Sequence, residues 1–178
     1  MRNLLYIILA ILIIPIGSIN AQQNVNFSQY IGTWKYTNTS TKEEFTVKLK
    51  ETIYTHPHNG TKKNCIVGIY IYKKNGQIIY DNSSQFTSNI SAIKMPIYAS
   101  TGGSGEVYPT GLCLYVKDYG KMKNGSPKTS EGWLTLISSS NPKQLRWQPE
   151  EPEGVYVAEQ APIPGFSIPT DIILTKVE

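Results

Sequence analysis

The sequence predicts an all-β domain, an antiparallel meander of about eight strands closed into a barrel, with a β-sandwich as the alternative. Apolar residues alternate with period two, and no segment sustains the 3.6-residue period of a helix. Turn-forming Gly, Pro, Asn and Ser residues separate nearly all of the alternating segments. Because strand edges must be paired or covered in a stable protein, this many short strands favour a closed sheet.

The N-terminus predicts a secretory signal peptide. A positive charge at Arg2 precedes the apolar run Leu4–Ile14, and the small residue Ala21 follows a Pro- and Gly-containing break. This order is typical of a signal peptide cleaved after Ala21. A membrane anchor is the weaker alternative, since the apolar stretch is shorter than the roughly 20 residues that a spanning helix needs. We therefore expect a secreted or periplasmic protein with a signal peptide at 1–21, a single β-barrel domain at 22–178 and no transmembrane segment after cleavage.

The first four strands are predicted from alternation and from one turn signal. In the second of them, Phe45, Val47 and Leu49 would face inward and the charged residues outward. The third is richer in Ile and Tyr, as in a strand covered on both faces. Asn75-Gly76 is a strong hairpin signal that leads into the fourth. The four segments are Tyr30–Tyr36, Glu44–Lys50, Cys65–Tyr72 and Gln77–Tyr80.

Four further strands are expected in the second half of the chain, at Leu112–Lys117, Gly132–Ser138, Lys143–Gln148 and Ile172–Val177. The segments between them are rich in turn residues. Ser83–Met95 is expected to be irregular or to form one helical turn, and Gly102–Gly105 and Pro149–Pro169 are expected to be irregular.

Charge and cysteine content limit the possible roles. The 17 Lys and Arg residues exceed the 13 Asp and Glu residues only slightly, and Arg146 is the one arginine after the leader. Because nucleic-acid binding needs a clustered basic face, no nucleic-acid partner is expected. In an oxidising compartment Cys65 and Cys113 form a candidate disulfide; the alternative is two separate buried thiols.

Gly32-Thr33-Trp34, on the first predicted strand ahead of a meander, resembles the start of a lipocalin or related calycin barrel. The resemblance implies that Trp34 closes one end of the barrel and that an arginine from a late strand packs across it. Arg146 matches that role by position. The other lipocalin motifs are absent.

The layout also resembles an uncharacterised family of small exported bacterial proteins, classed as a domain of unknown function. That resemblance implies no activity. The segments that carry it, besides Gly32-Thr33-Trp34, are Gly68–Tyr70, Ser140–Lys143, Leu145–Trp147 and Ile168–Lys176.

No motif predicts catalysis, a metal or a cofactor. His56 and His58 are the only histidines, and a zinc site needs at least a third ligand, so no metal site is expected. No Gly-x-Ser-x-Gly elbow is present. A pair of carboxylates for glycoside chemistry would have to come from residues that alternation mostly turns to solvent, namely Glu43, Glu44, Asp118, Glu131 and Asp171.

Three hypotheses for function follow. The first is a non-catalytic exported barrel that binds a small apolar or amphipathic ligand, since tyrosines are abundant and suit such recognition, although the same residues also suit a β-sheet core. The second is an interaction or inhibitor domain that uses the loops Ser83–Val107 and Pro149–Pro169 to bind a partner such as an envelope protein. The third is a carboxylate hydrolase, ranked last. The tyrosines in or beside the central strands are Tyr70, Tyr72, Tyr80, Tyr98, Tyr108, Tyr115 and Tyr119.

Overall fold

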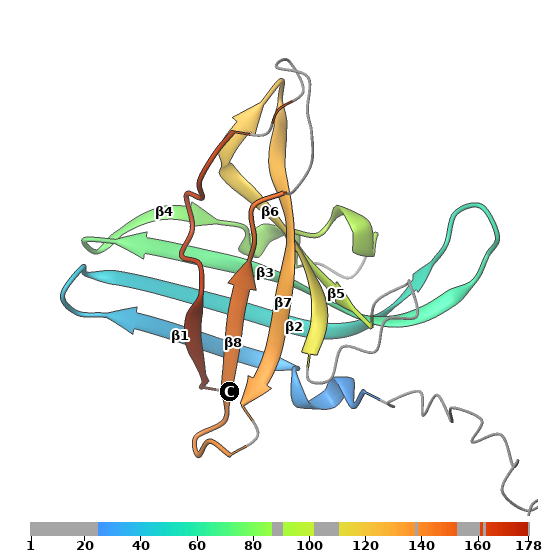
Figure 1. Ribbon diagram of the computed structural model, residues 1–178, viewed down its shortest axis with the longest axis horizontal. Helices are drawn as coiled ribbons and strands as arrows, with labels where there is room; N and C mark the ends of the chain where they lie inside the picture. Colours follow the sequence, from blue (N-terminus) through green and yellow to red (C-terminus); the bar gives the residue numbers. More distant parts are fainter. Residues whose placement is uncertain are drawn as a thin grey trace, which may run out of the picture.

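The computed structural model describes residues 25–86, 91–101, 111–137, 139–152, 161 and 163–177 (Figure 1). The predicted signal peptide at 1–21 lies outside these residues. Three short 3-10 helical turns occur among them, η1 (Phe27–Gln29), η2 (Ser83–Gln85) and η3 (Ala92–Lys94). The strands are β1 (Gly32–Asn38), β2 (Glu43–Thr55), β3 (Lys62–Lys74), β4 (Gln77–Asp81), β5 (Ile97–Ser100), β6 (Gly111–Lys123), β7 (Ser126–Ile137), β8 (Gln144–Pro149) and β9 (Ile172–Lys176).

The strands form one antiparallel sheet that closes into an eight-stranded barrel. Each barrel strand pairs with the next along the chain, in the order β1, β2, β3, β5, β6, β7, β8 and β9. The barrel closes where β9 returns to β1, with Trp34 opposite Lys176. The predicted all-β meander is therefore confirmed, and the sheet is a barrel rather than a sandwich.

Seven of the eight predicted strands belong to the barrel, and one does not. The predicted strand at Gln77–Tyr80 forms as β4, but it pairs only with β3 and is an extra strand outside the barrel. β5, which has only four residues and is not predicted from the sequence, is the barrel strand that lies between β3 and β6. Both partners fit because β3 is 13 residues long: it pairs with β5 through Ile66–Gly68 and with β4 through Ile71–Lys74.

Long hairpins extend beyond the barrel wall. β2 and β3 pair over their full length up to Thr55 and Lys62 and form an arm that curves away from the barrel (Figure 1). The β6–β7 hairpin turns at Asn124-Gly125, where both residues have positive φ values. Asn75-Gly76 has the same conformation between β3 and β4, so the hairpin predicted there is confirmed.

Large side chains fill the interior of the barrel. Trp34, Phe45, Tyr70 and Trp147 are each 0% exposed. The ring centroid of Phe45 lies 5.4 Å from that of Trp147 and 5.6 Å from that of Tyr70. An eight-stranded barrel is just wide enough to be packed in this way. Neither of the two pockets described below is lined by these core side chains, so the interior offers no support for a ligand inside the barrel.

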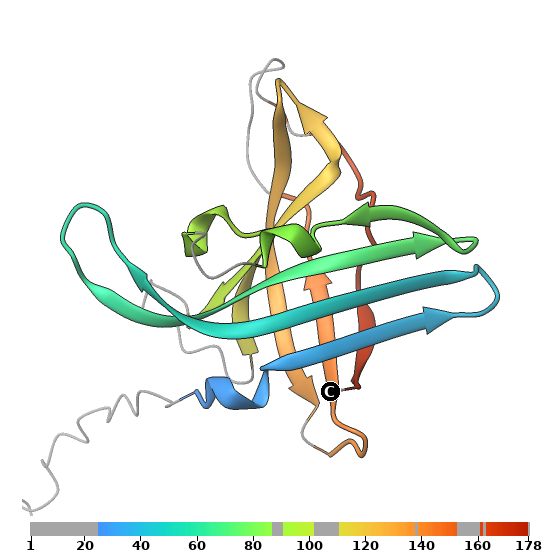
Figure 2. The same cartoon turned by 180° about the vertical axis from the view of Figure 1, so that it is seen from behind.

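A second apolar cluster covers part of the outer wall. Cys65, Val67 and Ile69 point outward from β3 and pack against Ala92 and Met95 of the connection between β4 and β5. Figure 2 shows the two helical turns of this connection, in green, on the outside of the sheet between the β2–β3 arm and the β6–β7 hairpin. The prediction that the third strand is covered on both faces is thus confirmed. For Ser83–Met95 an irregular segment or one helical turn is predicted. The described part of this connection contains two short turns, η2 and η3.

A buried carboxylate fastens the segment before β9 to β6. Asp118 is 0% exposed, and its oxygens accept hydrogen bonds from the backbone N–H groups of Gly120 and Ser167 and from the Ser167 hydroxyl. The described end of the Pro149–Pro169 loop is irregular, as predicted, but it is held against the barrel.

Candidate functional site

A groove of about 710 Å³ lies on the outside of the barrel. Its floor is the outer face of β5, β6 and β7, the β2–β3 arm forms one wall, and the connection before β5 forms the other. The lining residues are Tyr54, His56, Asn59, Thr61, Lys63, Ile93, Met95, Tyr98, Ser100, Thr101, Tyr115, Lys117, Thr129 and Glu131.

Strand register places three of these side chains in a row across the floor. Tyr98 lies opposite Tyr115, and Tyr115 lies opposite Glu131. Directly opposed residues on one face of a sheet contact each other, and here the two tyrosine ring centroids are 5.7 Å apart. Their inward-pointing neighbours, Ala99, Leu114 and Val116, are core residues, and this alternation turns the tyrosines outward.

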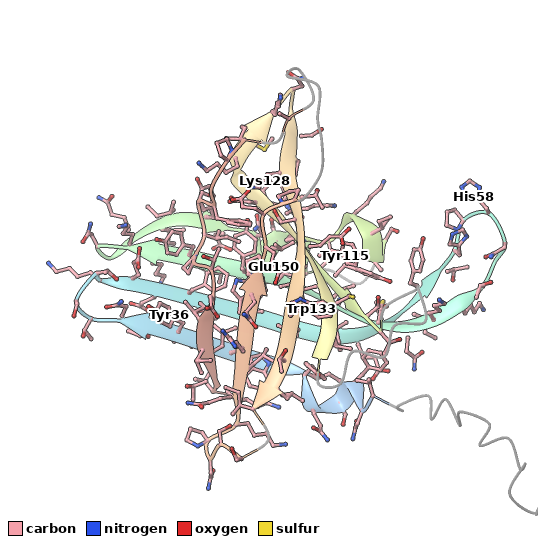
Figure 3. The ribbon with its side chains drawn as sticks, in the orientation of Figure 1. Tyr36, His58, Tyr115, Lys128, Trp133 and Glu150 are labelled. Carbon is pink, nitrogen blue, oxygen red and sulfur yellow. The ribbon has the colours of Figure 1, made fainter. Side chains whose placement is uncertain are left out.

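The arm adds three further rings to this row. The ring of Tyr54, near the end of β2, lies 5.9 Å from that of Tyr98, so it reaches past β3 to β5. The ring of His56 lies 6.3 Å from Tyr54, and that of His58 lies 5.6 Å from His56. Figure 3 shows His58 on the curved arm and Tyr115 on the barrel wall. Five aromatic side chains therefore contact one another in sequence, and we call them the ring row.

Polar groups also lie along the row. Burial raises the pKa values of Tyr98 and Tyr115, so both phenols keep their protons at neutral pH and can donate hydrogen bonds. Burial lowers the pKa of Lys117, whose ammonium donates to the carbonyl oxygen of Ile93 at 2.9 Å. That bond ties the floor of the groove to the wall before β5.

The structure corrects the predicted pair of Trp34 and Arg146. Trp34 is 0% exposed and points into the barrel, whereas Arg146 lies on the outer face of β8 between inward-pointing Leu145 and Trp147. The Arg146 guanidinium instead pairs with Asp171 at 2.8 Å, beside a second, shallower pocket. The cation over the Trp34 ring is Lys176, 5.5 Å from the centroid. Arg146 cannot pack on Trp34 inside the barrel because side chains alternate between the two faces of β8. Trp147 points inward, so its neighbour Arg146 points outward.

The candidate disulfide between Cys65 and Cys113 is not formed in the structure. The missed strand β5 lies between β3 and β6, which puts the two cysteine-bearing strands about 9.6 Å apart at the usual spacing of neighbouring strands. A disulfide needs its two Cα atoms within about 7 Å. Cys65 is buried, and burial raises its pKa to about 11.

The other candidate residues do not gather into one catalytic or metal site among the described residues. His56 lines the groove next to His58, and no group of three or more His, Cys, Asp or Glu residues in the described ranges is placed to hold a metal ion. Of the carboxylates considered, Glu131 lines the groove, Asp118 is buried beneath Ser167, and Glu43 and Glu44 form ion pairs with lysines.

Part of the groove is predictable from the sequence. Tyr98 and Tyr115 are among the tyrosines expected in or beside the central strands, whereas Tyr54 lies beyond the predicted end of the second strand. Tyr98 lies 44 positions after Tyr54. The two meet only because of the register of β2, β3 and β5, which the sequence alone does not give. Within the described ranges, no helix has the length and hydropathy required to cross a bilayer.

Comparison with known proteins identifies a family. Residues 1–177 match the model of a family described as "Family of unknown function (DUF6705)". No curated protein and no solved structure matches the chain.

Proposed function

This chain belongs to that family of unknown function, and we propose that it is an exported, non-catalytic β-barrel that binds a small amphipathic ligand in the groove on its outer wall. The observation that carries the proposal is the ring row beside the polar groups of Lys63, Lys117 and Glu131.

The volume and the lining of the groove support this function. About 710 Å³ lies within the usual range of small-molecule sites, which combine an apolar lining with a few polar groups. Tyr54, Tyr98 and Tyr115 are half-buried, so part of each ring is available for contact. A tyrosine offers an apolar ring and a polar tip, which suits a ligand of mixed character.

The outer wall of the barrel, rather than its interior, supports this binding function. The interior is occupied by Trp34, Phe45 and Trp147, so the binding hypothesis rests on the groove alone. The hydrolase hypothesis requires two carboxylates at one concave site, and Glu131 has no carboxylate partner among the described lining residues. The proposal is therefore a binding function.

The test is a titration of the isotope-labelled protein with anilinonaphthalene sulfonate, a fluorescent probe with apolar rings and one charge. We expect saturable one-to-one binding, with amide NMR shifts concentrated at Tyr54, Tyr98 and Tyr115. Tyr98→Ala should weaken binding about tenfold, since an aromatic contact contributes about 0.5–1.5 kcal/mol beyond its area. Shifts centred on Arg146 and Asp171 in the second pocket, or binding that does not saturate, would refute the proposal.

A further inference from the structure

We propose that the ligand of the groove is an oligosaccharide that lies along the ring row, from the floor of the barrel wall out to the β2–β3 arm. This inference rests on the proposed function, since it names the chemical class of the ligand for the same site. It is carried by the length of the row, by the angles between its rings and by the polar groups on both sides.

The row is extended rather than compact. Four successive ring contacts, with centroid separations between 5.6 and 6.3 Å, lead from His58 through His56 and Tyr54 to Tyr98 and Tyr115. Tyr54, His56, Tyr98 and Tyr115 line the groove, and His58 continues the row beyond the lining residues. A ligand that contacts these rings in succession must itself be a chain of several units. A single small ring system would contact only two or three of them.

The angles between the rings favour a jointed ligand. Neighbouring ring planes are inclined by 52° to 80°, so no two neighbours are parallel. A flat aromatic molecule cannot stack on two of these rings at once. A saccharide can do so, because each pyranose has an apolar C–H face for one ring and can rotate about its glycosidic bonds to meet the next.

The polar groups suit hydroxyls rather than an acyl chain. Thr129 and Glu131 of β7 line the groove on the floor, and Lys63 of β3 and Asn59 lie on the side of the arm. Asn59, Lys63, Thr129 and Glu131 are exposed. A lipid tail would remain in contact with water along such an open groove. A sugar places its hydroxyls around its rim, where an ammonium donates and a carboxylate accepts hydrogen bonds.

The test uses the full domain and four oligosaccharides: cellohexaose, chitohexaose, laminarihexaose and the acidic hexamer of galacturonic acid. Each is titrated by calorimetry and then used to displace anilinonaphthalene sulfonate. We expect at least one hexamer to bind one-to-one and to displace the probe. Its dimer should bind at least tenfold more weakly, because it contacts fewer rings. Binding of the acidic hexamer alone would identify the lysines, rather than the rings alone, as the selective groups.

Matched variants separate the ring row from the rest of the surface. Tyr54→Ala and Tyr115→Ala should each weaken hexamer binding about tenfold, whereas Tyr36→Ala on β1, outside the groove, should leave it unchanged. Melting temperatures of all three variants establish that the fold is retained. Figure 3 marks Tyr36 and Tyr115 on their separate strands.

The outcomes distinguish this inference from the proposed function. If the fluorescent probe binds in the groove and none of the hexamers displaces it, the saccharide inference is overturned and the binding function stands. If neither the probe nor any hexamer binds, both are overturned. Equal weakening by Tyr36→Ala and Tyr115→Ala would also overturn the assignment of the saccharide to the ring row.

Discussion

Replacing Phe45 by alanine tests whether side chains fill the interior of the barrel. The proposal of a binding site on the outer wall depends on this packing. Phe45 is 0% exposed and its ring lies among those of Tyr70, Tyr72 and Trp147, at centroid distances of 5.6, 6.3 and 5.4 Å. These neighbours belong to strands that are hydrogen-bonded on both sides, so the wall has little freedom to collapse around a void.

The expected cost follows from the buried surface. A buried phenylalanine removes on the order of 150 Å² from water, and at about 25 cal/mol per Å² this corresponds to about 4 kcal/mol as an upper estimate. Core Phe→Ala substitutions cost about 3–5 kcal/mol when the cavity term is included. We therefore expect Phe45→Ala to reduce the free energy of unfolding by about 3–4 kcal/mol.

The assay is guanidinium unfolding followed by tryptophan fluorescence, with Trp147 as a nearby reporter. The midpoint should fall while the slope m stays constant, which indicates a change in stability rather than in the unfolded state. Ile53→Ala is the matched control, since Ile53 lies on the same strand and is 60% exposed; it should change stability by less than about 0.5 kcal/mol. A cost below about 1 kcal/mol for Phe45→Ala would refute the packed interior and reopen the case for a ligand inside the barrel.

Three further predictions concern other contacts. Arg146→Ala should leave the melting temperature nearly unchanged, because its ion pair is exposed; a loss as large as that of a core aromatic residue would restore the predicted closing pair. The pKa of Glu43 lies below its ordinary value of 4.5, chiefly because the Tyr72 hydroxyl donates to it at 2.7 Å. Its contribution to stability is therefore present above pH 4.5 and lost as the pH falls through the lowered pKa, so the melting curves of wild type and Glu43→Gln should converge in acid; a constant difference would contradict this. In a Cys113→Ser variant, Cys65 should react with a thiol reagent only after unfolding, because it is buried and its pKa is raised to about 11; rapid reaction of the native protein would contradict its position under the second apolar cluster.

Local pattern was sufficient for most strands and for the β3–β4 hairpin turn. Alternation in Glu44–Lys50 predicted which side chains of β2 face the core, and Phe45, Val47 and Leu49 are all buried. Asn75-Gly76 predicted the β3–β4 hairpin, because a two-residue turn with positive φ values strongly favours such a pair. These features depend on residues close together in the chain.

The short strand β5 could not be predicted in the same way. The strand Ile97–Ser100 has only four residues and directly follows Pro96. Its conformation depends on partners in β3 and β6 that lie far away in the sequence. The error had two consequences. It made β4 one of the eight strands of the barrel wall. It also left out the strand that separates β3 from β6, so that Cys65 and Cys113 could be expected on neighbouring strands.

The sequence by itself determined the fold class, the alternation of the strands and the position of the Asn75-Gly76 turn, because period two and turn chemistry act over a few residues. Only the tertiary structure decided which strands close the barrel, which cation covers Trp34 and which aromatic residues meet in the ring row. Those contacts depend on register between distant strands: a shift of one residue in β8 would turn Arg146 inward, and a shift in β2 would turn Tyr54 away from the groove.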